Sequence, residues 1–226
     1  MESLLEAFTL LAGGERETWW TIATSLRFSL WSTVVAVIPG VPLGAALFLG
    51  RFKGKRAAVA LVNAIMAVPT VVVGLFVYSF ISRSGPLGPL DLMYSPGGVI
   101  LGQAVLAFPL VAAMSYTGLQ KLDPRYAETL LTLGAGPWRR MVAIVREGRY
   151  VIVQAVLAAF GRVTGEVGVS MMLGGNIRWY TRTMTTTIAL DAGKGEFERA
   201  LSLGFVLLAV ALVVNFLSHL AVRDAK

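Results

Sequence analysis

Five stretches of this sequence are apolar for long enough to cross a bilayer, and this limits the possible folds more than any other feature. They cover Ile22–Leu49, Ala57–Ser82, Gly97–Leu119, Tyr150–Gly174 and Ala200–Val222. A spanning helix needs about 20 largely apolar residues, and lipid offers no partner for backbone groups left outside a helix or a closed barrel. Only 15% of the residues are charged, against about 25% in soluble domains. We therefore predict an all-α membrane protein with one transmembrane domain, residues 1–226, and five spanning helices.

Basic residues are divided unequally between the two sides of these spans. Twelve Lys and Arg lie in the segments 51–56 and 121–149 and in the C-terminal tail, and seven lie on the opposite side. Positive residues collect on the cytoplasmic side of membrane proteins. The bias predicts an N-terminus outside, with the loop 123–149 and the C-terminus in the cytoplasm. It also accounts for the net charge of +7, so we do not expect nucleic acid as a partner.

The segment before the first span predicts a short helix on the membrane surface. Within Glu2–Leu11, the side chains of Leu4, Leu5 and Phe8 share one helical face and two glutamates lie opposite. An amphipathic helix of this kind lies in the plane of the interface, in contact with lipid. The acidic composition is the opposite of the basic start of a secretory signal, so we expect the first span to be retained.

Prolines interrupt the first three spans, at Pro39, Pro42, Pro69 and Pro109. A proline removes a backbone donor, and within lipid the freed carbonyl must be satisfied by a neighbouring helix or a wet cavity. Two interpretations stay open at this point. Either these helices surround something polar, or the prolines are part of ordinary helix packing.

Several kinds of chemistry are excluded or disfavoured by composition. There is no cysteine, which rules out disulfides, thiolate catalysis and thiolate metal ligands. The only histidine, His219, is isolated near the end of an apolar stretch, whereas transition-metal sites usually gather several ligands; we predict no metal site. No GxxxxGK[ST] loop is present, so we expect any ATP to bind to another chain.

The polar loop 123–149 has the pattern of two short helices. Asp123 and Pro124 are typical of a helix start, Gly134 and Gly136 of a break, and Pro137 of the first turn of a second helix. On the second helix, apolar residues recur at spacings of three and four: Trp138, Met141, Val142 and Val145. Such a face suits insertion into a groove of another protein. Contact with anionic lipid and packing against the rest of the chain are the alternatives.

The same loop resembles the EAA signature of ABC importer permeases. In that pattern a Glu-Ala-Ala motif is followed by a glycine and then by Ile-x-Leu-Pro, and here Glu128, Gly134 and Ile144 keep the spacing. Thr129 and Leu130 replace the two alanines, and Arg146-Glu147 replaces Leu-Pro. The resemblance implies an ATPase-docking loop with these coupling residues: Glu128, Gly134, Ala135, Trp138, Met141 and Ile144.

The stretch 160–190 resembles the molybdate, tungstate and sulfate permeases, and its GGNI…TRTMTT form is most similar to the tungstate branch. The resemblance implies a type I ABC importer fold in a prokaryotic inner membrane. It further implies a second copy of the chain, two cytoplasmic ATPase subunits that carry ATP and Mg, and an extracytoplasmic oxyanion-binding protein. The chain itself would catalyse no reaction. A molybdate or sulfate permease is the alternative within the family; an ion-coupled carrier or a membrane anchor is the alternative outside it.

Arg162 and Glu166 are charged residues in the middle of the fourth predicted span. Four residues apart, they share a helical face, and an unpaired charge there costs at least about 2.5 kcal/mol. We expect an ion pair that either fixes the helix or lines the pathway, with Glu166 neutralising Arg162. Three glycines nearby suit close helix packing, which includes a two-fold interface: Gly161, Gly165 and Gly168.

The outer connection 174–198 is rich in guanidinium, amide and hydroxyl groups, which suit a tetrahedral oxyanion. Contact with a binding protein or a gate, and contact with lipid headgroups, fit the same residues. The candidates are Asn176, Arg178, Thr181, Arg182 and Thr183. The apolar run Met184–Leu190 predicts a short helix that returns towards the membrane.

Overall fold

The computed structural model describes residues 15–223, and this part of the chain contains helices and no strand. The predicted surface helix Glu2–Leu11 lies outside the described residues. The helices in chain order are α2 (Arg16–Leu49), α3 (Lys55–Met66), α4 (Thr70–Ile81), the 3-10 helix η1 (Gly88–Leu90), α5 (Pro96–Leu119), α6 (Pro124–Thr132), α7 (Pro137–Glu147), α8 (Arg149–Thr164), α9 (Gly168–Gly174), α10 (Met184–Lys194) and α11 (Phe197–Arg223).

Three helices in the described range are long and apolar enough to cross a membrane without interruption, namely α2, α5 and α11. The other two predicted spans are bent pairs: α3 and α4 meet at 97°, and α8 and α9 at 63°. The five predicted spans are present if each bent pair counts as one span. The prediction of one uninterrupted helix over Ala57–Ser82, and of another over Tyr150–Gly174, is wrong.

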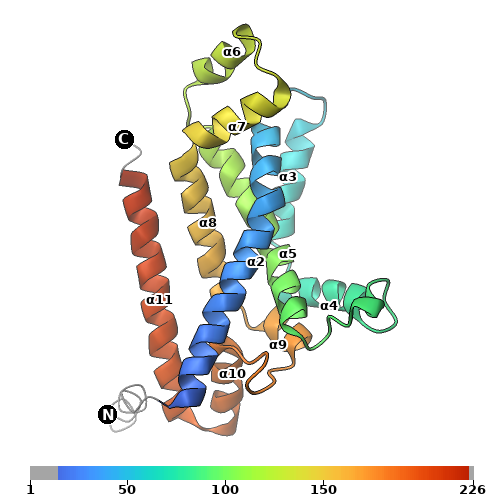
Figure 1. Cartoon of the computed structure of the whole chain (residues 1–226), viewed down its shortest axis with the longest axis vertical. Helices are drawn as coiled ribbons and strands as arrows, with labels where there is room; N and C mark the ends of the chain where they lie inside the picture. The colour runs from blue at the N-terminus through green and yellow to red at the C-terminus, as the bar shows by residue number, and fades with distance from the viewer. Residues whose placement is uncertain (1–14, 224–226) are drawn as a thin grey trace.

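The bend between α3 and α4 follows from Pro69. A residue that precedes proline is pushed away from the α-helical region, and α3 ends at Met66, three residues before it. Pro69 itself is extended, with ψ 134°, and α4 starts at Thr70. Figure 1 shows α4 leaving the bundle sideways at this point.

The remaining prolines lie inside helices that continue through them, Pro39 and Pro42 in α2 and Pro109 in α5. These two helices pack closely because small residues face each other. A β-carbon on Gly40 would come within 2.8 Å of Val111, and one on Gly44 within 2.7 Å of the Ala112 carbonyl oxygen. The apolar core around this contact includes buried residues of α2, α5 and α8.

A chain of buried polar side chains also crosses this core. The Ser32 hydroxyl of α2 lies 2.8 Å from Gln103 Oε1 of α5, and Gln103 Nε2 donates to the Ser170 hydroxyl of α9 at 3.0 Å. All three side chains are buried. The helices around the prolines therefore enclose polar groups, and these groups satisfy one another.

The two ends of the bundle differ in what they carry. In Figure 1, α6 and α7 lie at one end, and α10 lies at the other, beside the start of α2. The start of α2 and the end of α11 are at opposite ends, as an odd number of crossings requires.

Candidate functional site

The loop 123–149 is built as two short helices, as the sequence predicts. The Asp123 side chain accepts a hydrogen bond from the Arg125 backbone N–H at 2.9 Å and caps α6. Gly134 follows the end of α6 with φ +71°, in the left-handed region. The N–H groups of Ala135 and Gly134 then donate to the carbonyls of Leu130 and Leu131, both at 3.0 Å. This paired closure ends a helix at a glycine and turns the chain into α7.

One side of α7 packs against its own chain. Ile144 is fully buried against Ala45 and Leu119, and Met141 and Val145 are partly buried in the same cluster. Fewer residues of α7 are therefore available to a partner protein than the sequence predicts. Periodicity identifies an apolar face, but it does not identify the surface that covers it.

The most exposed apolar groups of the loop lie on its turn and at the start of α7. Leu133 is 76% exposed and Trp138 is 69% exposed, and Val142 lies on the same open side of α7. Glu128 is exposed, 4.0 Å from the guanidinium of Arg51. Gly134 is exposed and Ala135 half-buried. Sequence reasoning missed Leu133, although a leucine directly before a helix-ending glycine in a polar loop is a signal for it.

Arg162 and Glu166 face each other at the break between α8 and α9. Arg162 Nη1 lies 3.2 Å from Glu166 Oε2. The other carboxylate oxygen accepts a hydrogen bond from the Val169 backbone N–H at 3.3 Å, and the Glu166 carbonyl accepts one from Thr185 at 2.9 Å. Glu166 is thus anchored to α9 and α10 as well as to Arg162.

The three glycines near this pair meet different neighbours. A β-carbon on Gly161 would lie 3.4 Å from Val214 of α11, and one on Gly168 would lie 3.4 Å from Val71 of α4. Gly165 caps the end of α8 and has only carbonyl oxygens of its own helix within 4 Å. Two of the three predicted packing glycines therefore lie at helix contacts, and each contact involves a different helix.

At the end that carries α10, the connection 174–198 closes on a buried carboxylate. Glu17 of α2 forms ion pairs with Arg178, with Arg182 at 2.8 Å and with Arg199 at 2.8 Å. Arg199 also lies 3.6 Å from Asp191, and burial raises the pKa of Asp191 above its ordinary value, with Arg199 opposing the shift. We call these five residues the Glu17 cluster. Sequence reasoning missed Glu17 and Arg199 as partners of the two predicted arginines.

The other predicted residues of this connection have partners within the chain. Thr181 accepts a hydrogen bond from the Ile177 N–H at 3.0 Å. Thr183 caps α10 in a reciprocal pair with Thr186, and the Thr186 hydroxyl lies 3.0 Å from Asn176 Oδ1. The predicted short helix from Met184 is present as α10. Contact of these residues with an ion or a binding protein stays a prediction.

Most of the sequence matches the model of a known protein family. The model of the family described as binding-protein-dependent transport system inner membrane component matches residues 36–225. The chain belongs to this family.

Two relatives of this permease carry names that mention anions. The tungstate uptake system permease protein TupB of Campylobacter jejuni is 36% identical over 214 residues, which is 95% of this chain and 90% of the relative. A probable anion ABC transporter permease protein of Haloferax volcanii is 38% identical over 86% of each chain. Both alignments span nearly the whole length.

The fold of the permease is that of type I ABC importers, and the chain is a multi-pass membrane protein. A solved structure of the MetNI methionine ABC transporter, in inward-facing conformations, superposes with a TM-score of 0.73 at 18% identity, covering 94% of this chain and 99% of that one. At this identity the likeness concerns the fold alone.

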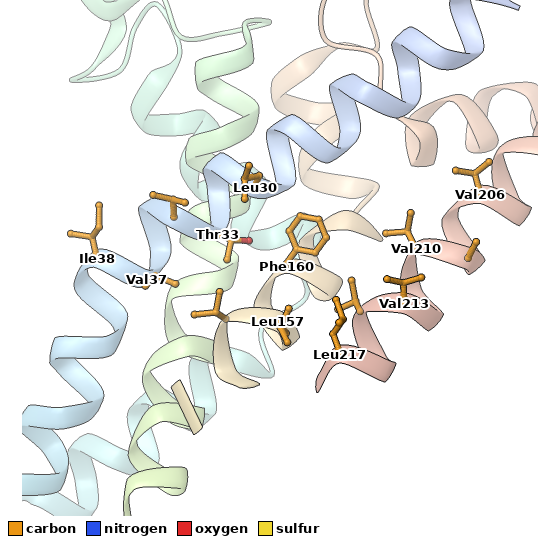
Figure 2. A pocket seen from close by; sticks show the side chains of 14 residues that line it. Leu30, Thr33, Val37, Ile38, Leu157, Phe160, Val206, Val210, Val213 and Leu217 are labelled. Atoms are coloured by element: carbon orange, nitrogen blue, oxygen red, sulfur yellow. The ribbon is translucent and has the colours of Figure 1, made fainter. Parts of the chain in front are cut away.

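A large apolar groove of the permease has no charged residue on its wall. It has a volume of about 730 Å³ between α2, α8 and α11, and Figure 2 shows Leu30, Phe160 and Val210 projecting into it. The single polar side chain on its wall, Thr33, donates its hydroxyl to the Ser29 carbonyl at 2.7 Å. This groove offers no free donor to an anion and is not suited to an ion pathway.

Among residues 15–223, no group of three or more His, Cys, Asp or Glu side chains is placed to hold a metal ion.

Proposed function

We propose that this chain is the transmembrane permease subunit of an ATP-driven importer for an oxyanion, and that the oxyanion is tungstate. The observation that carries the proposal is the 36% identity to a tungstate uptake permease over 95% of the chain. The loop 123–149, with its two helices and its exposed turn, supports the coupling function.

In this proposal the permease performs no covalent chemistry. Two copies form the pathway, and each presents its loop 123–149 to one of two ATPase subunits that bind ATP and Mg. The exposed side chains of Leu133 and Trp138 provide an apolar anchor for that contact, because large apolar groups at the centre of an interface supply most of its binding energy. The excess of basic residues supports a cytoplasmic loop and an N-terminus outside.

Transport requires two gate states. An extracytoplasmic binding protein loaded with the oxyanion favours one state and the ATP-bound ATPase dimer the other, since a ligand shifts an equilibrium only by its difference in affinity for the two states. The Glu17 cluster lies at the end away from the ATPase loop, so in this proposal it supports the side of the permease that meets the binding protein.

The test is uptake by the complete complex. The permease is purified with its native ATPase and binding protein, reconstituted in vesicles and supplied with labelled tungstate, with molybdate and sulfate as competitors. We expect ATP-dependent uptake that unlabelled tungstate suppresses at the lowest concentration. Suppression by molybdate or sulfate at a lower concentration overturns the assignment of tungstate as the substrate.

The same vesicles separate the function from its alternatives. Uptake by the permease alone, driven by an ion gradient without ATP, identifies an ion-coupled carrier. Absence of uptake from a complex that hydrolyses ATP identifies a membrane anchor. Either result overturns the proposed function.

A further inference from the structure

We propose that the Arg162 guanidinium lines the ion pathway and gives a divalent tetrahedral oxyanion a transient contact midway along the bilayer crossing. This inference rests on the proposed function and adds a contact site for the ion within the membrane. The observation behind it is that Arg162 and Glu166, although paired, differ in exposure: the Arg162 side chain is 49% exposed and that of Glu166 is 4% exposed.

The two charged groups of this pair differ in how fully their hydrogen-bonding capacity is used. Here Glu166 is buried and has a second donor, the Val169 N–H. Arg162 uses one nitrogen, Nη1, for the ion pair. Its remaining N–H groups have no partner within residues 15–223. The free donors of the pair thus belong to the arginine alone.

The position of Arg162 in a spanning segment restricts what these donors can face. A guanidinium inside a spanning segment has to face water, a cavity or another protein surface, because contact with hydrocarbon is costly. Arg162 lines a cavity of about 110 Å³ and is the only charged residue on its wall. Val68 and Pro109 lie on the same wall, so the cavity adjoins the bend at which α4 turns away from the bundle.

A proline of α5 also lines this cavity. Pro109 has no N–H, so the carbonyl four residues earlier, that of Val105, lacks its usual helical donor. Val105 also lines the cavity. Within the membrane, a carbonyl freed in this way is satisfied by a neighbouring helix, a hydroxyl side chain or water. The bend, the proline and the arginine therefore occur together at one place.

The chemistry suits passage of an anion rather than its retention. The guanidinium fork donates parallel hydrogen bonds that match the oxygens of a tetrahedral anion. Glu166 lies directly behind it and holds the net charge of the pair at zero, which weakens the hold on a divalent anion. Conduction needs sites that bind strongly enough for entry and weakly enough for release.

The first test uses the absence of cysteine from the sequence. Arg162→Cys introduces a single thiol on this chain, and charged, water-soluble methanethiosulfonates label it only from water. In the assembled complex with its ATPase and binding protein, we expect labelling at position 162 and slower labelling when tungstate and loaded binding protein are present. Val163→Cys, at the buried neighbouring position, is the matched control and should stay unlabelled. Resistance of position 162 to the reagents, with and without ATP, overturns the inference.

Charge restoration provides a second readout on the same variant. A reagent that leaves an ammonium group at position 162 should recover part of the uptake, whereas one that leaves a sulfonate should recover none. Equal recovery by both reagents contradicts a role for the positive charge.

The third test separates a pathway role from a packing role. In the double variant Arg162→Gln with Glu166→Gln, both charges are removed, and both positions keep a polar side chain that can form hydrogen bonds. If the pair only packs the helix, the double variant should assemble and take up the oxyanion as the wild type does. The pathway role predicts normal complex yield and normal ATPase activity, with uptake reduced by at least about tenfold, as expected for a lost charge-assisted contact.

Uptake by the wild-type complex separates a failure of the Arg162 site from a failure of the proposed function. Wild-type uptake together with equal uptake by the double variant overturns the Arg162 site and leaves the proposed function intact. A wild-type complex that takes up no oxyanion overturns the proposed function, and this inference with it.

Discussion

The Gln103 amide of α5 donates a hydrogen bond of 3.0 Å to the Ser170 hydroxyl of α9. Its carbonyl oxygen lies 2.8 Å from the Ser32 hydroxyl of α2, so one side chain joins three helices within the apolar core. Hydrogen bonds between membrane helices contribute about 0.6 kcal/mol on average, and up to about 2 kcal/mol.

Replacing Gln103 by leucine should therefore lower the free energy of unfolding by about 1–2 kcal/mol, because two interhelical hydrogen bonds are lost at once. Thermal melting of the purified permease in detergent measures the change. Thr117→Val is the control, since the Thr117 hydroxyl bonds only to the Ala113 carbonyl of its own helix. A Gln103→Leu variant with the same melting temperature as the wild type would show that this chain of polar side chains adds no stability.

Gly134→Leu should uncouple the permease from its ATPase while leaving it in the membrane. No neighbouring atom lies within 4 Å of a β-carbon at this position, but φ is +71°, and a left-handed conformation costs a residue other than glycine about 1–2 kcal/mol. The strain tilts α7 relative to α6. ATP-dependent uptake in vesicles is the measurement.

Gly134→Asn is the matched control for this change, because asparagine tolerates the left-handed region better than other side chains. It should retain most of the uptake that Gly134→Leu loses. Full uptake by Gly134→Leu would count heavily against a coupling role for the turn.

Trp138→Ala should weaken binding of the ATPase by about 30-fold, as for an aromatic anchor worth about 2 kcal/mol. Because the side chain is exposed, the melting temperature should not change. Binding of the purified ATPase to immobilised permease gives the affinity. Ile144→Ala provides the contrast: Ile144 is buried against Leu119, so its truncation should cost about 2–5 kcal/mol of stability. Equal ATPase binding by Trp138→Ala and wild type would remove Trp138 from the interface.

Glu17→Gln should loosen the end of the bundle that carries α10. Three arginines lose their shared carboxylate, and breaking a buried ion pair costs about 3–5 kcal/mol; the half-exposed Arg178 places the expected loss near the lower limit. Limited proteolysis within residues 176–183 should be faster than in the wild type. Glu15→Gln serves as control, since Glu15 is exposed. Equal cleavage rates in Glu17→Gln and wild type would refute the clamping role of Glu17.

Local signals explain which parts of this structure the sequence predicted well. The helices of the loop start at Pro124 and Pro137 and break at Gly134, as predicted, because a cap depends on a few adjacent residues. Pro69 marked an interruption but not its angle. That angle depends on how α4 packs across the fold: a β-carbon on Gly74 would come within 2.9 Å of Met172 in α9.

Partners from distant parts of the chain escaped sequence reasoning. Arg178 and Arg182 were recognised as donors, but their carboxylate, Glu17, comes from the other end of the described chain. Ile144 was assigned to the coupling loop and is buried within its own chain. In both cases the pattern identified a chemical group, and only the fold determined what that group contacts.

The Glu17 cluster has a consequence for biogenesis. The ribosome makes α2 well before α11, the helix to which Arg199 belongs. Until that helix emerges, the carboxylate of Glu17 lacks one of its three arginines and Asp191 lacks its partner. A nascent chain that stops before α11 therefore leaves incompletely paired acids at the end of the bundle, and the cluster closes only after the start of α11 has been made.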